Sequence, residues 1–86
     1  MNTLIISTFS CTFEEFKTDV SGFITVMGKE VVSEYEFVQA AEHKSHLLMN
    51  VLDMEALKAE MTSDAAKEWD KKNNCNDSVY AIELVE

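Results

Sequence analysis

Apolar residues in the first third of the chain follow first a strand pattern and then a helix pattern. Residues 4–9 start with three consecutive aliphatic side chains and are rich in residue types that favour strands, which predicts a strand. From Thr12 to Met27, large apolar residues recur at spacings of three, four and seven, which predicts a helix with one apolar face. Thr12 and Glu15 match a capping box, and Gly28 stands where a left-handed C-cap residue belongs.

The middle of the chain changes to a two-residue period. Residues 31–40 place Glu34 and Glu36 on one side and neutral side chains on the other, which is typical of an edge strand whose charges discourage further pairing. Residues 42–44 turn the chain back. Residues 44–52 predict the next strand, and from residue 46 to residue 52 it is apolar on both sides.

The last third predicts a helix in two parts followed by a strand. Asp53 is the expected N-cap of a helical stretch that runs to residue 73, and the Thr-Ser-Asp sequence at 62–64 looks like a second cap that restarts the helix. Residues 73–77 are expected to form a loop, and residues 79–85 the final strand.

This order of elements, β-α-β-β-α-β, predicts an α+β fold of the ferredoxin-like type. We expect a single domain over residues 1–86, with an antiparallel four-stranded sheet in the order 4-1-3-2 and two helices on one face. Three of the strands are apolar on both sides. Leaving the second sheet face in water would be unfavourable by about 25 cal/mol for each Å² of apolar surface.

We therefore expect a homodimer in which the uncovered sheet faces of two copies meet by twofold symmetry. The residues assigned to this dimer interface are Ile5, Ser7, Phe9, Leu48, Asn50, Leu52, Val79, Ala81 and Glu83.

Charge and cysteine content narrow the classes of partner. Sixteen acidic residues against seven basic ones give a net charge of −9, and such a surface repels nucleic acid and anionic membranes. No basic residue precedes Lys17 and no apolar run approaches membrane-spanning length, so we expect a cytoplasmic protein without a signal peptide. Cys11 and Cys75 are too few for a disulfide scaffold, although the expected strand order makes them neighbours.

The segment 52–69 carries a resemblance to a known family. There a strand ends at Asp53, a short helix follows, and a Ser63-Asp64 break precedes a second helical stretch that contains Trp69. Together with the order of elements, this segment resembles the dimeric α/β-barrel superfamily, which includes antibiotic-biosynthesis-monooxygenase-type and stress-responsive barrel domains. The resemblance implies the ferredoxin-like fold and a range of functions, among them cofactor-independent oxygenases, haem-degrading enzymes and isomerases.

The residues of this chain depart from the haem-degrading branch. That branch uses an Asn on the first strand and a Trp and a His near the second helix. This chain has Ser7, Glu60 and Asp70 at those positions, and its Trp69 lies one position away. We therefore expect no haem and no other cofactor.

Large, deformable side chains are assigned to the layer between helices and sheet. They indicate either a packed core or a slot for an apolar ligand, long-chain or aromatic, because the chain has no Arg to bind a phosphate or carboxylate. The residues assigned to this slot are Phe16, Phe23, Met27, Tyr35, Met49, Met61, Trp69 and Tyr80.

Histidine chemistry is limited to two residues. His43 and His46 are three positions apart in or near a strand, so they point to opposite sides and predict no metal site. His46 is a candidate for a catalytic acid or base, with an ordinary surface histidine as the alternative, and a tyrosine could take the same role. Three hypotheses stay open: a dimer that binds an apolar ligand, a cofactor-independent oxygenase or isomerase, and a structural dimer with a filled core.

Overall fold

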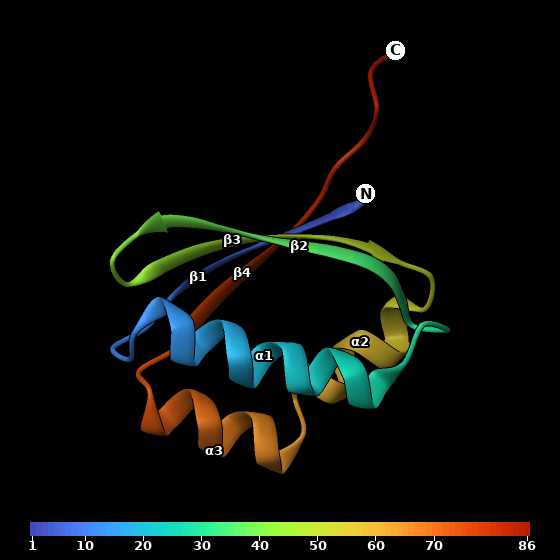
Figure 1. Ribbon diagram of the computed structural model, residues 1–86. Helices are drawn as coiled ribbons and strands as arrows, with labels where there is room; N and C mark the ends of the chain where they lie inside the picture. The colour runs from blue at the N-terminus through green and yellow to red at the C-terminus, as the bar shows by residue number, and fades with distance from the viewer.

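The computed structural model describes residues 1–86, which form one antiparallel sheet in the order β2-β3-β1-β4 with three helices on one face (Figure 1). The elements are β1 Thr3–Thr8, α1 Phe13–Met27, β2 Val32–Ala41, β3 Lys44–Val51, α2 Met54–Met61, α3 Asp64–Lys72 and β4 Asn76–Ala81. This architecture confirms the predicted ferredoxin-like α+β fold and its strand order, with the second helix divided into α2 and α3.

The helix boundaries follow the capping residues seen in the sequence. The Thr12 hydroxyl accepts a hydrogen bond from the Glu15 backbone N–H at 3.1 Å, and Gly28 ends α1 with a φ of 84°. The Asp53 carboxylate accepts from the Ala56 N–H at 3.0 Å and caps α2. Ser63 caps α3, so the predicted restart of the helix is confirmed.

The core lies between β3 and the helices. Alternate residues of β3 are buried, and Leu47, Met49 and Val51 face the helices as the pattern predicts. The buried apolar cluster consists of Ile5, Ile24, Val32, Leu47, Met49, Val51 and Leu57. The opposite face of the sheet has no helix over it (Figure 1).

The predicted facing of β1 is wrong. Ile5 and Ser7 lie beside Leu47 and Ser45 of β3 and are buried under the helices, and Phe9 just beyond the strand stacks on Phe16 of α1. These residues therefore do not lie on the open face. Both sides of β1 carry aliphatic residues, so the two-residue period alone does not decide which side is covered.

The last strand also differs from its prediction. β4 runs from Asn76 to Ala81, which are paired with Thr8 and Thr3, the two ends of β1. One further hydrogen bond, from the Ile82 N–H to the Asn2 carbonyl, ends the pairing. Val79 and Ala81 pair with helix-facing residues of β1, which removes them from the open face too. Glu83 lies beyond the strand.

Of the predicted interface set, Leu48 and Asn50 do lie on the open face, and Leu52 follows β3 with 62% of its surface exposed. Apolar side chains of all four strands form a patch on this face, with His46 and Glu36 beside them. We call it the open-face patch, and it comprises Leu4, Ile6, Val38, Leu48 and Tyr80. The chain leaves the body of the protein after β4 (Figure 1). No helix is both long and apolar enough to cross a membrane.

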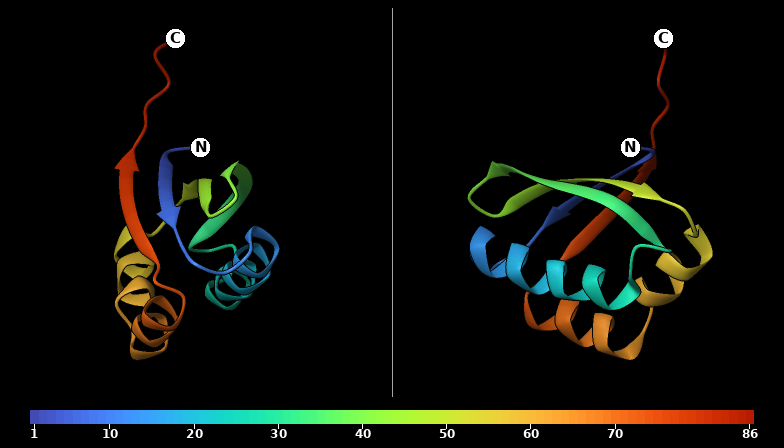
Figure 2. Two further views of the ribbon diagram at one scale, coloured as in Figure 1. Left: turned by 90° about the vertical axis from the view of Figure 1, so that its left-hand side faces the viewer. Right: turned by 45° about the vertical axis from the view of Figure 1, so that its right-hand side comes forward.

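The helices divide the covered face between them. Viewed along the sheet, α1 lies toward β2 and β3, and α3 lies on the side of β4 (Figure 2). The first strand of the chain, β1, and its last two elements, α3 and β4, are therefore neighbours.

Candidate functional site

A partly open cavity lies between the sheet and the helices. Its volume is about 80 Å³, and thirteen of its seventeen lining residues are hydrophobic. Buried side chains such as Ile5, Met49 and Leu57 form its floor, and half-buried ones such as Phe23, Met61 and Trp69 form its rim. The lining residues are Ile5, Ser7, Phe16, Val20, Phe23, Ile24, Met27, Leu47, Met49, Leu57, Glu60, Met61, Ala66, Trp69, Asp70, Cys75 and Asp77.

Six of the eight residues assigned to the slot line this cavity: Phe16, Phe23, Met27, Met49, Met61 and Trp69. The other two do not. Tyr35 pairs with Met49 across the strands and faces the helices as Met49 does. It lies on the edge strand, however, where it packs against Phe37 and is 42% exposed. Tyr80 pairs with Leu4 and so belongs to the open face, because the face on which each β4 residue lies is set by its partner in β1.

Trp69 holds α3 in place beside the cavity. Its indole N–H donates to the Asp19 carboxylate of α1 at 2.9 Å. Its ring packs against Phe16 and Phe23 of the same helix, with centroid distances of 5.8 Å and 6.4 Å. No other residue of α3 is as large and apolar, so this side chain fixes the distance between α3 and α1.

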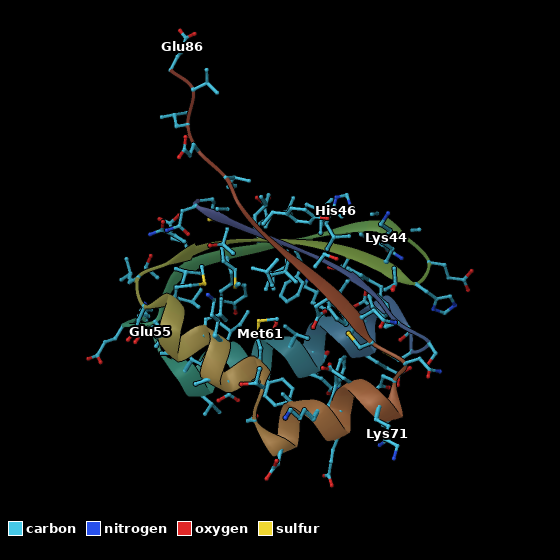
Figure 3. The ribbon with its side chains drawn as sticks, turned by 180° about the vertical axis from the view of Figure 1, so that it is seen from behind. Lys44, His46, Glu55, Met61, Lys71 and Glu86 are labelled. Carbon is cyan, nitrogen blue, oxygen red and sulfur yellow. The ribbon has the colours of Figure 1, made fainter.

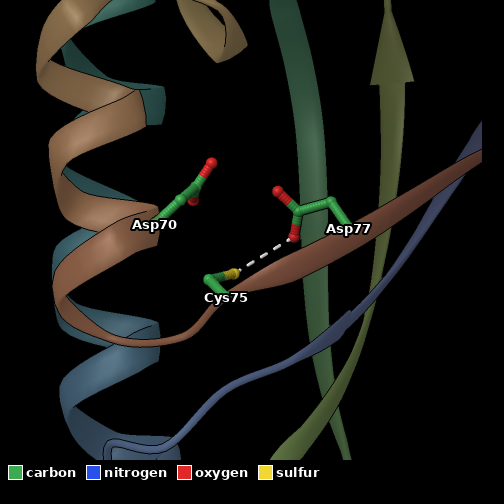
Figure 4. A group of neighbouring side chains, drawn as sticks. All are labelled: Asp70, Cys75 and Asp77. Carbon is green, nitrogen blue, oxygen red and sulfur yellow. Dashed lines mark hydrogen bonds between the residues drawn. The ribbon is translucent and has the colours of Figure 1, made fainter.

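One end of the cavity is polar. Asp70 at the end of α3, Cys75 in the following loop and Asp77 in β4 point toward one another (Figure 4). The Asp77 carboxylate accepts hydrogen bonds from the Ser7 hydroxyl and, at 3.3 Å, from the Cys75 thiol. Pairing of β1 with β4 places Ser7 directly opposite Asp77, and Asn74 with a φ of 48° turns the chain between α3 and β4.

Burial and nearby negative charge raise the pKa values of Asp70 and Cys75. Partial burial and the nearby Asp77 charge raise the pKa of the Asp70 carboxyl above its ordinary value. Burial and the two neighbouring carboxylates raise the pKa of the Cys75 thiol far above that of a free cysteine. The thiol is therefore protonated and unreactive at neutral pH.

The same three residues are the group that could hold a metal ion. One potential ligand atom from each lies within 4.8 Å of the others. A metal such as zinc would require the Cys75 thiolate, and the raised pKa of this thiol opposes its formation.

Sequence reasoning missed this polar end, although a signal was present. The three positions at which the chain departs from the haem-degrading branch, Ser7, Glu60 and Asp70, all line the cavity. Asp77 and Cys75 join them through the register of β4 against β1, which the hydrophobic pattern does not reveal although it predicts that the two strands are neighbours.

Neither histidine reaches the cavity. His46 pairs with Ile6 and Val38 on the open face, and Figure 3 shows it on the side of the sheet away from Met61 and the helices. His43 lies in the β2–β3 turn, where its ring nitrogen is 2.8 Å from the Cys11 carbonyl oxygen. Cys11 and Cys75 are both free thiols.

Comparison with known proteins agrees on the fold. The chain has the fold class of ferredoxin-like α+β proteins, and no family model and no curated protein matches its sequence. A crystal structure described as a putative antibiotic biosynthesis monooxygenase from Deinococcus radiodurans matches with a TM-score of 0.51 and 11% identity. The match covers 98% of this chain and 93% of that one, which confirms for the fold the expected resemblance to antibiotic-biosynthesis-monooxygenase-type domains.

Proposed function

We propose that this protein binds a small apolar molecule, or the apolar part of a larger one, in the cavity between sheet and helices. The observation that carries the proposal is the cavity itself, whose walls are apolar and whose rim is open to solvent. The methionines among its lining residues have flexible side chains that adjust to a ligand without breaking regular structure.

The size of the cavity restricts what enters it. An engineered apolar cavity that binds benzene measures about 150 Å³, whereas this one measures about 80 Å³. A short alkyl chain fits this space, and a single ring fits when a methionine moves. The remainder of a longer molecule extends through the rim.

Binding is tested with two neutral probes, hexanol and toluene. Trp69 is the only tryptophan and lines the cavity, so a bound probe is expected to shift its emission and to raise the melting temperature. Ala66→Leu adds a branched side chain at the cavity wall and is expected to abolish both responses. Ala65→Leu is the matched control, since this neighbour on α3 is exposed and does not line the cavity.

Absence of any response in the unmodified protein would refute the ligand-binding function and favour a filled core. An unchanged response in Ala66→Leu would show that the probes bind outside this cavity.

We also propose that the functional unit is a homodimer formed through the open-face patch. The support is the patch itself, which lies on a sheet face that carries no helix and which a second copy covers by symmetry. Leu48→Glu places a charge within the open-face patch and is expected to reduce the sedimenting mass from dimer to monomer at micromolar concentration. Val26→Glu, on α1 and 80% exposed, is the control that should leave the mass unchanged. A monomeric unmodified protein contradicts the dimer.

A further inference from the structure

The charged groups that line the cavity are all negative, and this determines the chemistry of a ligand that reaches them. Four of its lining residues are polar or charged: three carboxylates, Glu60, Asp70 and Asp77, and one hydroxyl, Ser7. No Lys, Arg or His lines the cavity. None of these carboxylates forms an ion pair, because the one ion pair of the structure joins His43 and Glu42 at 3.8 Å.

The hydrogen-bonding capacity of this end is one-sided. An ionised carboxylate accepts hydrogen bonds and donates none. Among the lining residues at this end, the Ser7 hydroxyl and the Cys75 thiol are the side-chain donors, and both already donate to Asp77. The Ser45 hydroxyl beside Ser7 has no partner, but it is fully buried and does not line the cavity. A ligand that reaches this end therefore meets acceptors that have unused lone pairs and no free donor.

The electrostatic field of Asp70 and Asp77 also favours a positively charged ligand group. Asp77 opposes the ionisation of Asp70, so the two carboxyls repel each other in the absence of a counter-charge. A positive group between them relieves this repulsion, whereas an anionic group adds to it. Partial burial strengthens both effects relative to open water.

Resting on the proposed binding function, we infer that the cavity selects molecules with an apolar part and a cationic amine, which lies against Asp70 and Asp77. The apolar walls bind the hydrocarbon, and the carboxylates accept hydrogen bonds from the ammonium group. A ligand with a carboxylate or phosphate at this end is excluded.

The test compares three probes with the same chain: hexylamine, hexanol and hexanoate, each in the presence of EDTA so that no metal ion contributes. Affinity is measured from Trp69 emission and from shifts of backbone amide signals in NMR spectra. We expect hexylamine to bind about five- to tenfold more tightly than hexanol, the effect of one charge-assisted hydrogen bond at a partly exposed site. Hexanoate should bind more weakly than either. Added salt should reduce the preference for the amine.

Two variants locate the preference. The double variant Asp70→Asn, Asp77→Asn keeps the shape of the site and should bring the ratio of amine to alcohol affinity close to one. Glu68→Gln removes one negative charge from the exposed side of α3, outside the cavity, and should leave the ratio unchanged. The single variant Asp70→Asn, which keeps the Asp77 hydrogen bonds to Ser7 and Cys75, serves if the double variant does not fold.

The outcomes separate this inference from the binding function. If hexanol binds and hexylamine binds no better, or if the preference survives in the Asn variant that folds, the inference is wrong and the binding function stands. If a Glu68→Gln exchange removes the preference, overall net charge and not the site explains it. If none of the three probes binds, the binding function itself fails.

Discussion

The two halves of the helix-covered sheet face are packed differently. Beneath β2 and β3, Val32 and Val51 pair with each other and keep only 3% and 6% of their surface exposed. At β4, the opposite edge of the same face, Val79 is 45% exposed although its β1 partner Ile5 is buried, and α3 below it contains no buried residue. The cavity lies between these two regions, since Met49 of β3, Ile5 of β1 and Trp69 of α3 all line it.

The sequence of α3 explains the difference. Its side chains toward the cavity are small or polar apart from Trp69, which spans the distance to α1. Ala66 leaves room at the wall where a leucine would fill it. A helix that touches the core through one large side chain closes the layer without filling it.

The largest difference between the halves should appear in matched valine truncations. Val51→Ala removes two buried carbons and is expected to lower the free energy of unfolding by about 2–3 kcal/mol, from lost burial and the cavity left behind. Val79→Ala, the same exchange in β4, should lower it by about 0.5 kcal/mol or less. Urea denaturation measures both, and equal losses would show that the halves are packed alike.

The thiol at the cavity end should react slowly. Burial, then Asp77 and Asp70, raise the pKa of Cys75, so its thiolate is scarce at mildly alkaline pH. We expect iodoacetamide to modify Cys75 at least about tenfold more slowly in the native protein than in urea. Peptide mapping by mass spectrometry follows both cysteines.

Cys11 is the internal control for this reaction. Its pKa is also raised, by partial burial and by the charges of Glu15 and Asp19, but its thiol donates no hydrogen bond to a carboxylate, as the Cys75 thiol does, and a smaller slowing is expected. Native Cys75 reacting as fast as in urea would mean that the β4 half opens freely to solvent.

The link between α3 and α1 can be weakened at its hydrogen bond. Asp19→Ala removes the acceptor of the Trp69 indole N–H and is expected to destabilise the protein by about 0.5–1.5 kcal/mol. Thr18→Ala, an exposed exchange on the same helix, corrects for the higher helix propensity of alanine. The two variants are compared by thermal unfolding. Equal stability would mean that aromatic packing alone holds α3.

The smallest effect concerns the pH dependence of stability. Because the pKa of Asp70 is raised in the folded state, its ionisation destabilises the fold. This penalty is absent below the unfolded-state pKa of the carboxyl and complete above its folded-state pKa. Asp70→Asn should therefore stabilise the protein at neutral pH, by no more than about 0.5 kcal/mol since the carboxyl is mostly exposed, and should give no gain in acid.

Urea titrations at neutral and acidic pH measure this gain. Glu86→Gln at the exposed end of the chain is the control for one lost charge. A gain that is independent of pH would assign the effect to something other than ionisation of Asp70.

The sequence predicts the fold better than it predicts the site, for a physical reason. Caps such as Thr12, Ser63 and Gly28 act within a few residues, so their local pattern determines where the helices begin and end. The facing of β1 and the start of β4 depend on pairing between strands some seventy residues apart. The contact between Ser7 and Asp77 results from that pairing, and for this reason the apolar walls were predicted and the polar end was not.

The break between α2 and α3 has a consequence for local unfolding. Ser63 starts α3 as a separate helix, so its backbone hydrogen bonds do not continue those of α2. A short helix with no buried residue opens at a lower free energy than the core strands beside it. Amide hydrogens of α3 should thus exchange with solvent before those of α1 and β3, through openings that leave the rest of the fold intact. Each such opening uncovers the cavity, so molecules enter and leave it without unfolding the domain.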